Sequence, residues 1–405
     1  MENKPLYLKN EIQDYAWGSY EFIQDLLGAE QTDTPWAELW MGAHPKAPSK
    51  IQVNGEWRAL DRLIESYPEE ILGRETARRF NNTLPYLFKV LAAEQPLSIQ
   101  AHPNREQAKN GFDRENHEGI PLTASNRNYK DDRHKPECIC ALTPFWAMEG
   151  FRPINEMVEL LKAACPKTLG DAIAYLKQKP NGNGFRRFFE ALMTLPEPKL
   201  QQVIDETAAN AIVRQSENAE FRWIKTLYEL YPEDIGILSP ILLNLVCLQP
   251  GEALFLNSGE MHAYLHGAGI EIMANSDNVL RGGLTAKHVD VEELMRVLNF
   301  DPHGLQILTL QERLACEKVY PTPAEEFSLG VIRVDAHCSY ATAQIIGPEI
   351  LLCTHGDGEI QWDDAAETLR ISKGDAYLIP AAVKRYSISG TAQIYRAAVG
   401  DLLPA

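Results

Sequence analysis

The stretch PGEALFLNSGEMHAYLHG, residues 250–267, decides the fold prediction. Gly251 and Glu252 mark a turn, and the short apolar run after them predicts a β-strand that ends at a second turn, Ser258-Gly259. His262 follows that turn directly. A strand, a tight turn and a histidine in this order indicate a β structure with an imidazole at the end of a strand.

A second polar pair lies in LSIQAHP, residues 97–103, which is also predicted to form a strand. Residues two apart on a strand point to the same face, so Gln100 and His102 direct an amide and an imidazole toward one spot. The segment alone leaves two interpretations open: a buried metal site, or a polar pair that is simply hydrogen-bonded in the core.

Length and composition place the chain among ordinary globular proteins of two or three domains. It has 405 residues, of which 45% are hydrophobic and 23% charged. The net charge of −17 argues against general nucleic-acid binding and requires local Lys and Arg to hold any anionic substrate. The N-terminus lacks the apolar segment of a secretory signal, and no apolar run is long enough to span a membrane. Seven cysteines without framework spacing, with a single C-x-C at Cys138 and Cys140, favour a reducing cytoplasm over a disulfide scaffold.

The secondary-structure signals change twice along the chain. Residues 1–152 and 237–300 are rich in short β-like runs broken by Gly, Pro and Asn. Residues 153–236 space their apolar residues at three and four, as amphipathic helices do, and the tail from about residue 321 returns to β. This order predicts a mainly β protein, in which a β-domain is interrupted by a helical insert and followed by a second β-domain.

The stretch 250–267 resembles the second sequence motif of cupins, with Asn257 in place of the usual proline and His266 in place of the last asparagine. In cupins the histidine of this motif points into a small β-barrel, where it meets ligands from an earlier H-x-H motif. Gln100-Ala101-His102 resembles that earlier motif, with glutamine in place of its first histidine.

The cupin resemblance implies two jelly-roll β-domains plus an all-α domain. The tail carries a weaker copy of the motif, with Gly374 and Pro380 at matching spacing but Arg385 where the histidine would be. We therefore expect only the first β-domain to bind metal. The expected division is a catalytic zinc-binding cupin domain at 1–152 and 237–320, a helical insert at 153–236, and a C-terminal cupin-like domain without metal at 321–405.

Two glutamates compete for the place of a further metal ligand. The general cupin pattern would offer Glu106, which lies in a polar stretch typical of a solvated helix or loop. Glu137 begins a half-buried strand, where a carboxylate without a partner would be costly. Burial therefore favours Glu137.

Five segments, in the right order over most of the chain, resemble the type I phosphomannose isomerases, which are zinc-dependent cupin enzymes. They are YAWG (15–18), ELWMGAHPKAPS (38–49), PYLFKVLAAEQPLSIQAHP (85–103), HKPE (134–137) and GEMHAYLHGAGIEIMANSDNVLRGGLTAKHVD (259–290). The resemblance implies that this chain interconverts mannose 6-phosphate and fructose 6-phosphate. It also implies one zinc ion per chain, held by Gln100, His102, Glu137 and His262.

The resemblance further implies a catalytic arginine, Arg281, in the motif N-x-L-R-G-G. Aldose–ketose isomerisation moves a proton between C1 and C2 through an enediolate, whose charge a metal ion and a fixed cation would stabilise. Glu271 and Lys135 are both candidates for the group that carries the proton, and the sequence does not choose between them.

No P-loop motif occurs, so cations and hydroxyls would have to hold a phosphate group. Ser98 and Lys287 are candidates, and Lys89 is added on the strength of the resemblance. Trp17 and Tyr264 either flank the sugar or simply pack. Five histidines have no ligand-like spacing and receive no role: His117, His288, His303, His337 and His355.

Two other classes of protein stay open at this point. A cupin oxygenase with Fe²⁺ would normally use three histidines and a glutamate, so Gln100 counts against it. A non-catalytic sugar-binding cupin would not need Arg281, Glu271 and Lys135 beside a complete metal set. We expect a small phosphosugar as the partner, no nucleic acid and no membrane, a monomer, and a cytoplasmic location.

Overall fold

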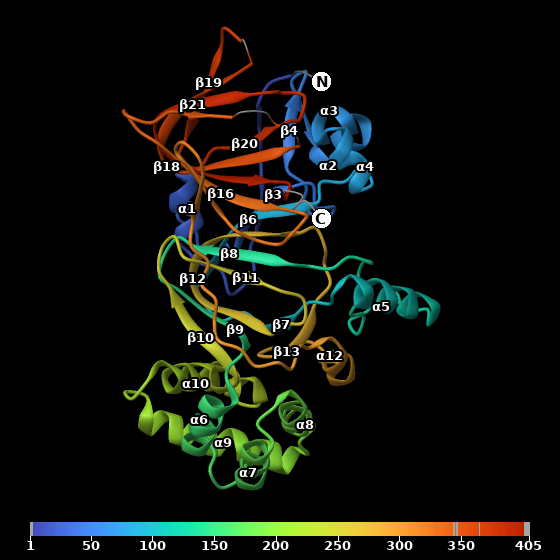
Figure 1. The fold of residues 1–405 in the computed structure, drawn as a ribbon, viewed down its shortest axis with the longest axis vertical. Coiled ribbons are helices and arrows are strands. Elements are labelled where there is room, and N and C mark those ends of the chain that lie inside the picture. Colours follow the sequence, from blue (N-terminus) through green and yellow to red (C-terminus); the bar gives the residue numbers. More distant parts are fainter. Residues whose placement is uncertain (1–2, 343–344, 346, 364, 401–405) are drawn as a thin grey trace.

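The computed structural model describes residues 3–342, 345, 347–363 and 365–400. This part of the chain is mainly β, as the sequence predicts. In Figure 1 the C-terminal strands lie at one end of the long axis, a second group of strands lies in the middle, and the helices of residues 154–230 lie at the other end.

The middle layer is a ten-stranded sheet in which every described pairing is antiparallel. It contains β2 (Glu11–Gln13), β3 (Glu38–Gly42), β6 (Tyr86–Ala93), β7 (Ile99–Ala101), β8 (Glu137–Ala141), β9 (Phe145–Phe151), β10 (Leu243–Leu248), β11 (Ala253–Leu256), β12 (His262–Ala274) and β13 (Leu280–Gly283). A small hairpin of β4 (Lys50–Val53) and β5 (Glu56–Ala59) lies outside it.

Strand β12 holds this sheet together because it changes partners along its length. Its first residues pair with β7 and β9, and the residues from Gly267 onward pair with β6 and β8. The register shifts between Tyr264 and His266, and Gly267 follows with a φ of 119°. A Cβ at Gly267 would lie 2.6 Å from the carbonyl oxygen of Pro144, so only glycine fits this bend.

The strands of the middle layer alternate between two environments. In β7, Ile99 and Ala101 join the core beneath the helices, whereas Gln100 between them faces the opposite side, toward a cavity. In β6, Val90 joins the core shared with the C-terminal strands, and Lys89 faces that same cavity. Strand alternation therefore places polar side chains on one face without exposing the core.

The C-terminal strands form a nine-stranded antiparallel sheet. It contains β1 (Leu6–Tyr7), β14 (Gln311–Leu314), β15 (Glu317–Tyr320), β16 (Ser328–Val334), β17 (Tyr340–Ala341), β18 (Glu349–Trp362), β19 (Thr368–Ser372), β20 (Ala376–Ile379) and β21 (Tyr386–Ala398). Strands β14 and β15, which lie before the expected boundary at residue 321, belong to this sheet, because β14 pairs with β15 and β15 pairs with β16. The N-terminal β1 also joins this sheet, through β20. Hydrogen bonding to distant strands decides these memberships, and the local sequence does not reveal it.

Half of the α-helices in the described residues lie in one consecutive run between β9 and β10. This run comprises α6 (Ile154–Ala164), α7 (Gly170–Gln178), α8 (Gly182–Met193), α9 (Glu197–Arg214), α10 (Ala219–Leu230), the 3₁₀ turn η1 (Ile235–Leu238) and α11 (Ser239–Leu242). The other helices are α1 (Phe22–Leu27), α2 (Leu60–Ser66), α3 (Pro68–Leu72), α4 (Arg74–Arg79), α5 (Arg105–His117) and α12 (Val291–Val297). No helix in the described ranges is long and apolar enough to cross a membrane.

Two of the seven cysteines form a disulfide, which the sequence analysis did not expect. Cys316, in the turn between β14 and β15, is bonded to Cys338, which follows β16. The pairing of β15 with β16 brings the two residues together across a separation of 22 residues, and no sequence spacing signals it. The other cysteines are free.

A buried ionic network stabilises the C-terminal sheet. Arg396 is 2% exposed, and its guanidinium lies 2.6 Å from Oε1 of Glu317 and 2.8 Å from Oε1 of Glu349.

We predict that Arg396→Ala lowers the free energy of unfolding by about 3–5 kcal/mol, because it leaves two buried carboxylates without their cation. Urea denaturation followed by tryptophan fluorescence measures this loss. The exposed Arg333→Ala serves as the control, and an equally small loss in both variants would contradict the prediction.

Candidate metal centre

Three side chains approach one point in the middle layer, and a fourth predicted ligand, Gln100, lies across from one of them. Gln100 lies in β7, His102 follows the end of β7, Glu137 begins β8 and His262 begins β12. His262 is the direct cross-strand partner of Gln100, so the two side chains lie on the same face. The sheet therefore joins residues from three distant parts of the chain.

The carboxylate of Glu137 and the imidazoles of His102 and His262 have the spacing of a tetrahedral metal site. Nε2 of His102 lies 3.3 Å from Oε1 of Glu137, and Nε2 of His262 lies 3.4 Å from Oε2 of the same carboxylate. Ligand atoms around a tetrahedral Zn²⁺ at about 2.0–2.1 Å are about 3.3 Å apart. All three residues are at most 3% exposed. The geometry therefore fits zinc.

Backbone carbonyls orient both imidazoles. Nδ1 of His102 donates to the carbonyl of Asn278 at 2.7 Å, and Nδ1 of His262 donates to the carbonyl of Glu260 at 3.0 Å. Each Nε2 is then left with a lone pair that faces Glu137. Nε2 of His102 is a buried nitrogen without a hydrogen-bond partner in the described structure, which is the state expected of a metal ligand.

The protonation states also suit a metal ion. Burial and the nearby Lys135 lower the pKa of His102 to about 4, so the ring is neutral at physiological pH. Burial alone would raise the pKa of Glu137, but Lys135 and His102 hold it well below its ordinary value. Nζ of Lys135 lies 2.8 Å from Oε1 of this carboxylate. A site with a neutral His102 imidazole and an ionised Glu137 carboxylate is ready to bind a divalent cation.

The structure brings Glu137 into this cluster and leaves Glu106 outside it. Glu106 is exposed in the first turn of α5, whose N-terminus is capped by Asn104 and Gln107. Its carboxylate belongs to an ordinary solvated helix.

A cavity of about 70 Å³ lies beside the cluster and gathers most of the predicted site residues. Its lining includes Ser98, Gln100, Glu137, His262, Tyr264, Lys135, Lys89 and Glu271. The hydroxyl of Tyr264 is buried there without a hydrogen-bond partner among the described residues, so it can bind a ligand atom.

Lys89 is held between two carboxylates at the wall of the cavity. Its Nζ lies 2.9 Å from Oε2 of Glu271 and 3.3 Å from Oε1 of Glu38. Burial alone would lower the pKa of Lys89, but the two carboxylates raise it well above its ordinary value. Burial raises the pKa of Glu271, and Lys89 opposes that shift. Lys89 is therefore an ion-paired cation in this structure.

Sequence reasoning missed Glu38. This residue is buried in β3, where it accepts a hydrogen bond from Nε1 of Trp40 at 2.8 Å as well as pairing with Lys89. The available signal was an acidic residue at the start of the apolar run ELWM, because a buried strand accommodates a carboxylate only with a partner.

Three further predicted residues, Arg281, Trp17 and Lys287, lie outside the cavity lining. Arg281 is half-buried in β13 directly across from Gln100, and no carboxylate of the described chain pairs with it. Burial lowers the pKa of Arg281. Trp17 is half-buried against the apolar cluster that contains Tyr264, and Lys287 is exposed.

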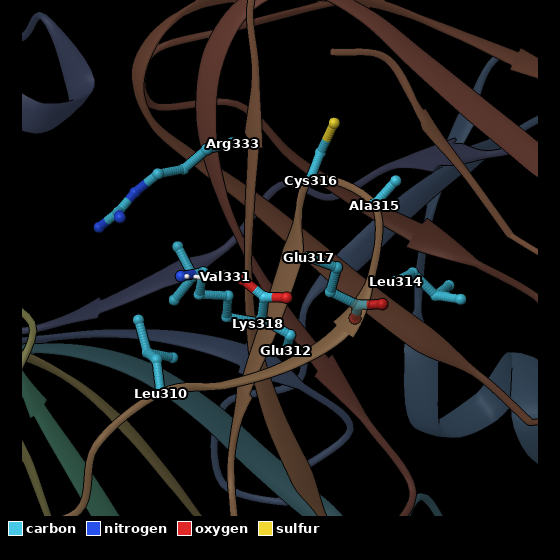
Figure 2. A pocket seen from close by; sticks show the side chains of 9 residues that line it. All are labelled: Leu310, Glu312, Leu314, Ala315, Cys316, Glu317, Lys318, Val331 and Arg333. Carbon is cyan, nitrogen blue, oxygen red and sulfur yellow. Dashed lines mark ion pairs between the residues drawn. The ribbon is translucent and has the colours of Figure 1, made fainter.

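A second cavity, of about 220 Å³, lies at the edge of the C-terminal sheet (Figure 2). Lys318 and Glu312 form an ion pair there, and Arg333 points away from them. The lining carries Cys316, which is in the disulfide, and has no group of metal-ligating side chains within the described residues. The chemistry of the molecule is therefore concentrated in the middle layer.

Comparisons with known proteins agree with this arrangement. Residues 6–154 match the family model of the phosphomannose isomerase type I catalytic domain. The mannose-6-phosphate isomerases of Salmonella typhimurium and Escherichia coli are each 39% identical to the chain, over 96% of it and 98% of each relative. The crystal structure of an alanine-substituted phosphomannose isomerase from Salmonella typhimurium has a TM-score of 0.91 at 38% identity, over 98% of this chain and 99% of that one. A zinc-bound mannose 6-phosphate isomerase has a TM-score of 0.88 at 37% identity, with the same coverage.

We predict that His102→Ala and His262→Ala each lose most of the bound zinc while the protein stays folded. Each substitution removes a metal bond, whereas the apolar cores of the two sheets persist. Metal analysis by mass spectrometry, with circular dichroism as a check of folding, measures both effects. Glu106→Ala is the control and should keep its zinc. Full zinc occupancy in either histidine variant would remove that residue from the ligand set.

Proposed function

The chain belongs to the type I phosphomannose isomerase family, and we propose that it interconverts mannose 6-phosphate and fructose 6-phosphate through an enediolate. The observation that carries the proposal is the buried His102–Glu137–His262 cluster beside a cavity that also holds Lys135 and Glu271. The two other classes of protein considered from the sequence were an iron oxygenase and a non-catalytic sugar-binding protein. Because the chain belongs to this family, we propose the isomerase in their place.

Gln100, His102, Glu137 and His262 would hold the zinc ion. When bound, zinc supplies a Lewis acid that polarises an oxygen of the open-chain sugar. Three of the four ligands are neutral and one carries a single negative charge, so the centre retains a net positive charge. The buried position of these residues excludes bulk water, which strengthens every electrostatic interaction in the cavity.

One residue of the cavity has to remove the proton from C2 of the aldose and return it to C1. Glu271 and Lys135 remain the two candidates in this proposal. The raised pKa of Glu271 supports Glu271 as the base, because a base with a pKa closer to neutrality transfers protons more effectively. Lys135 is supported by its position 2.8 Å from Glu137, which places an ammonium group beside the metal cluster.

Arg281 would stabilise the negative charge that develops on the sugar oxygens. Its position across from Gln100 supports this role, as does the absence of a paired carboxylate in the described structure. A guanidinium stays protonated at any physiological pH, so it is a fixed cation.

The remaining predicted residues would bind the rest of the substrate. Ser98 and the unpartnered hydroxyl of Tyr264 are supported by their place in the cavity lining. Lys89 would contribute a positive charge, although its ammonium group is also ion-paired with Glu271. The half-buried Trp17 would pack near the sugar. Lys287 is exposed, so it would reach the phosphate only from the rim.

We also propose that both large sheets are cupin-type jelly rolls and that the helices between β9 and β10 form a separate all-α domain. The bend of β12, which pairs with strands on both sides of the cavity, supports the first assignment. The second β-domain would bind no metal, because Arg385 stands at its histidine position. Five of the seven cysteines are free despite the Cys316–Cys338 disulfide, and this, with the phosphorylated substrate, supports a cytoplasmic location. We also propose a monomer.

The basic test is a coupled assay with mannose 6-phosphate. We predict that the purified protein forms fructose 6-phosphate, that removal of metal by a chelator abolishes the activity, and that added Zn²⁺ restores it, because the metal ligands are preformed. The absence of product from the zinc-loaded protein would refute the proposed function.

Arg281→Ala tests the role of the fixed cation. We predict that it keeps its zinc and its melting temperature but loses about 3–4 kcal/mol of transition-state stabilisation, which is about a hundred- to a thousand-fold in turnover. Arg281→Lys should recover only part of the rate, because a point charge does not reproduce the planar guanidinium.

The control is Arg58→Ala, which removes an exposed arginine in the β4–β5 hairpin. Steady-state kinetics compare the variants. Turnover of Arg281→Ala within about threefold of the wild type would leave Arg281 with a structural role only.

A further inference from the structure

A second cluster of metal-ligating side chains lies outside the cavity described above. Glu149 comes from β9, Glu260 from the turn before β12, and His303 from the segment after α12. Their ligand atoms all lie within 4.8 Å of one another. Nε2 of His303 is 3.8 Å from Oε1 of Glu149 and 3.9 Å from Oε2 of Glu260. None of the three lines the cavity beside His262.

Neighbouring groups orient two of these side chains toward the centre of the cluster. Nδ1 of His303 donates to the carbonyl of Asp301 at 3.1 Å, so Nε2 presents its lone pair to the two carboxylates. Oε1 of Glu260 accepts a hydrogen bond from Nδ2 of Asn299 at 3.0 Å, which leaves Oε2 facing His303. Outer hydrogen bonds of this kind are typical of metal ligands.

The surroundings of Glu149 provide an independent indication of a cation-binding role. Its side chain is 7% exposed and is directed into the cluster, yet it accepts no hydrogen bond from any side chain or backbone group in the described ranges. The nearest donor atom, Nε2 of His303, is too distant at 3.8 Å for a hydrogen bond. A buried carboxylate without a donor is costly unless a cation completes its environment.

The backbone around the cluster is built to hold these groups close together. Nδ2 of Asn244 donates to the carbonyls of Glu149, Gly150 and His303 at 3.0, 3.3 and 3.1 Å, so one amide ties β9 to the segment that carries His303. Gly150 has a φ of 63°, and a Cβ there would lie 2.9 Å from the ring of His303. Only glycine allows the imidazole to approach Glu149 this closely.

We propose that Glu149, Glu260 and His303 bind a second divalent cation of the Mn²⁺ or Zn²⁺ class. Two carboxylates balance the charge of such an ion, and a mixed oxygen and imidazole set suits these metals. The ion would draw Nε2 of His303 closer to each of the two carboxylates, from 3.8 and 3.9 Å to about 3.3 Å. The imidazole is 39% exposed, so water can complete the coordination.

This site is separate from the proposed isomerase activity, and it would stabilise the position of one of the zinc ligands. The carbonyl of Glu260 accepts the hydrogen bond of Nδ1 of His262. A cation bound to the side chain of Glu260 would therefore fix the segment that orients one of the catalytic zinc ligands. The role is structural, and the ion would not contact the substrate.

Binding of Mn²⁺ to the zinc-loaded, full-length protein tests the proposal. Electron paramagnetic resonance measures free Mn²⁺ in a titration, so the readout is independent of activity. We predict one bound Mn²⁺ per chain in the wild type and at least a 10- to 100-fold weaker affinity in His303→Ala, because outer hydrogen bonds alone are worth roughly that factor. His117→Ala removes an exposed histidine from α5 and is the matched control.

Two further variants make the result decisive. Glu149→Gln keeps the shape of the side chain but removes its charge, so it should weaken Mn²⁺ binding even if His303→Ala fails to fold. His102→Ala disrupts the catalytic zinc site and should keep the bound Mn²⁺, which distinguishes this site from the catalytic centre. The proposal is overturned if the wild type binds no Mn²⁺ at about 1 mM, the weak end of ordinary affinities. Equal binding by the wild type, His303→Ala and Glu149→Gln overturns it as well.

Discussion

The buried carboxylate of Glu137 is the constraint on which the centre of this protein depends. It lies 3.3 and 3.4 Å from two imidazoles and 2.8 Å from an ammonium group, and almost none of it is exposed to water. The ammonium group of Lys135 is the strongest of the influences that keep it ionised in an environment that otherwise favours the neutral acid. The strands β7, β8 and β12 have to meet at one point to provide those neighbours.

The bend in β12 makes that meeting possible. A regular strand that paired with β6 and β8 over its whole length would carry Glu271 but would not bring His262 beside Gln100. Gly267 lets the strand change partners, so one strand contributes a candidate metal ligand from its first half and a candidate base from its second half. The same bend leaves the apolar residues of β12 in the core shared with the C-terminal sheet.

Charge is arranged locally rather than over the whole molecule. The chain has a net charge of −17, which repels an anionic phosphosugar at long range. Inside the cavity the acidic residues are largely neutralised, because Lys89 pairs with Glu271 and Glu38, and Lys135 pairs with Glu137. Arg281 lies across from Gln100 on the neighbouring strand and has no such partner in the described structure.

The sequence by itself determined the mainly β class, the helical run after β9 and the family, and it predicted the three residues that cluster at His102, Glu137 and His262. Those features are encoded locally, in turns, apolar periodicity and motifs such as Q-x-H at Gln100 and H-K-P-E before Cys138. Only the tertiary structure decided that Glu38 completes the site around Lys89, that β14 and β15 belong to the C-terminal sheet, and that Cys316 meets Cys338. It also decided that His303, which has no ligand-like spacing, lies against two carboxylates. These contacts join residues that are far apart in the chain. The residues meet because distant strands and segments pair with one another, and no local sequence pattern predicts that pairing.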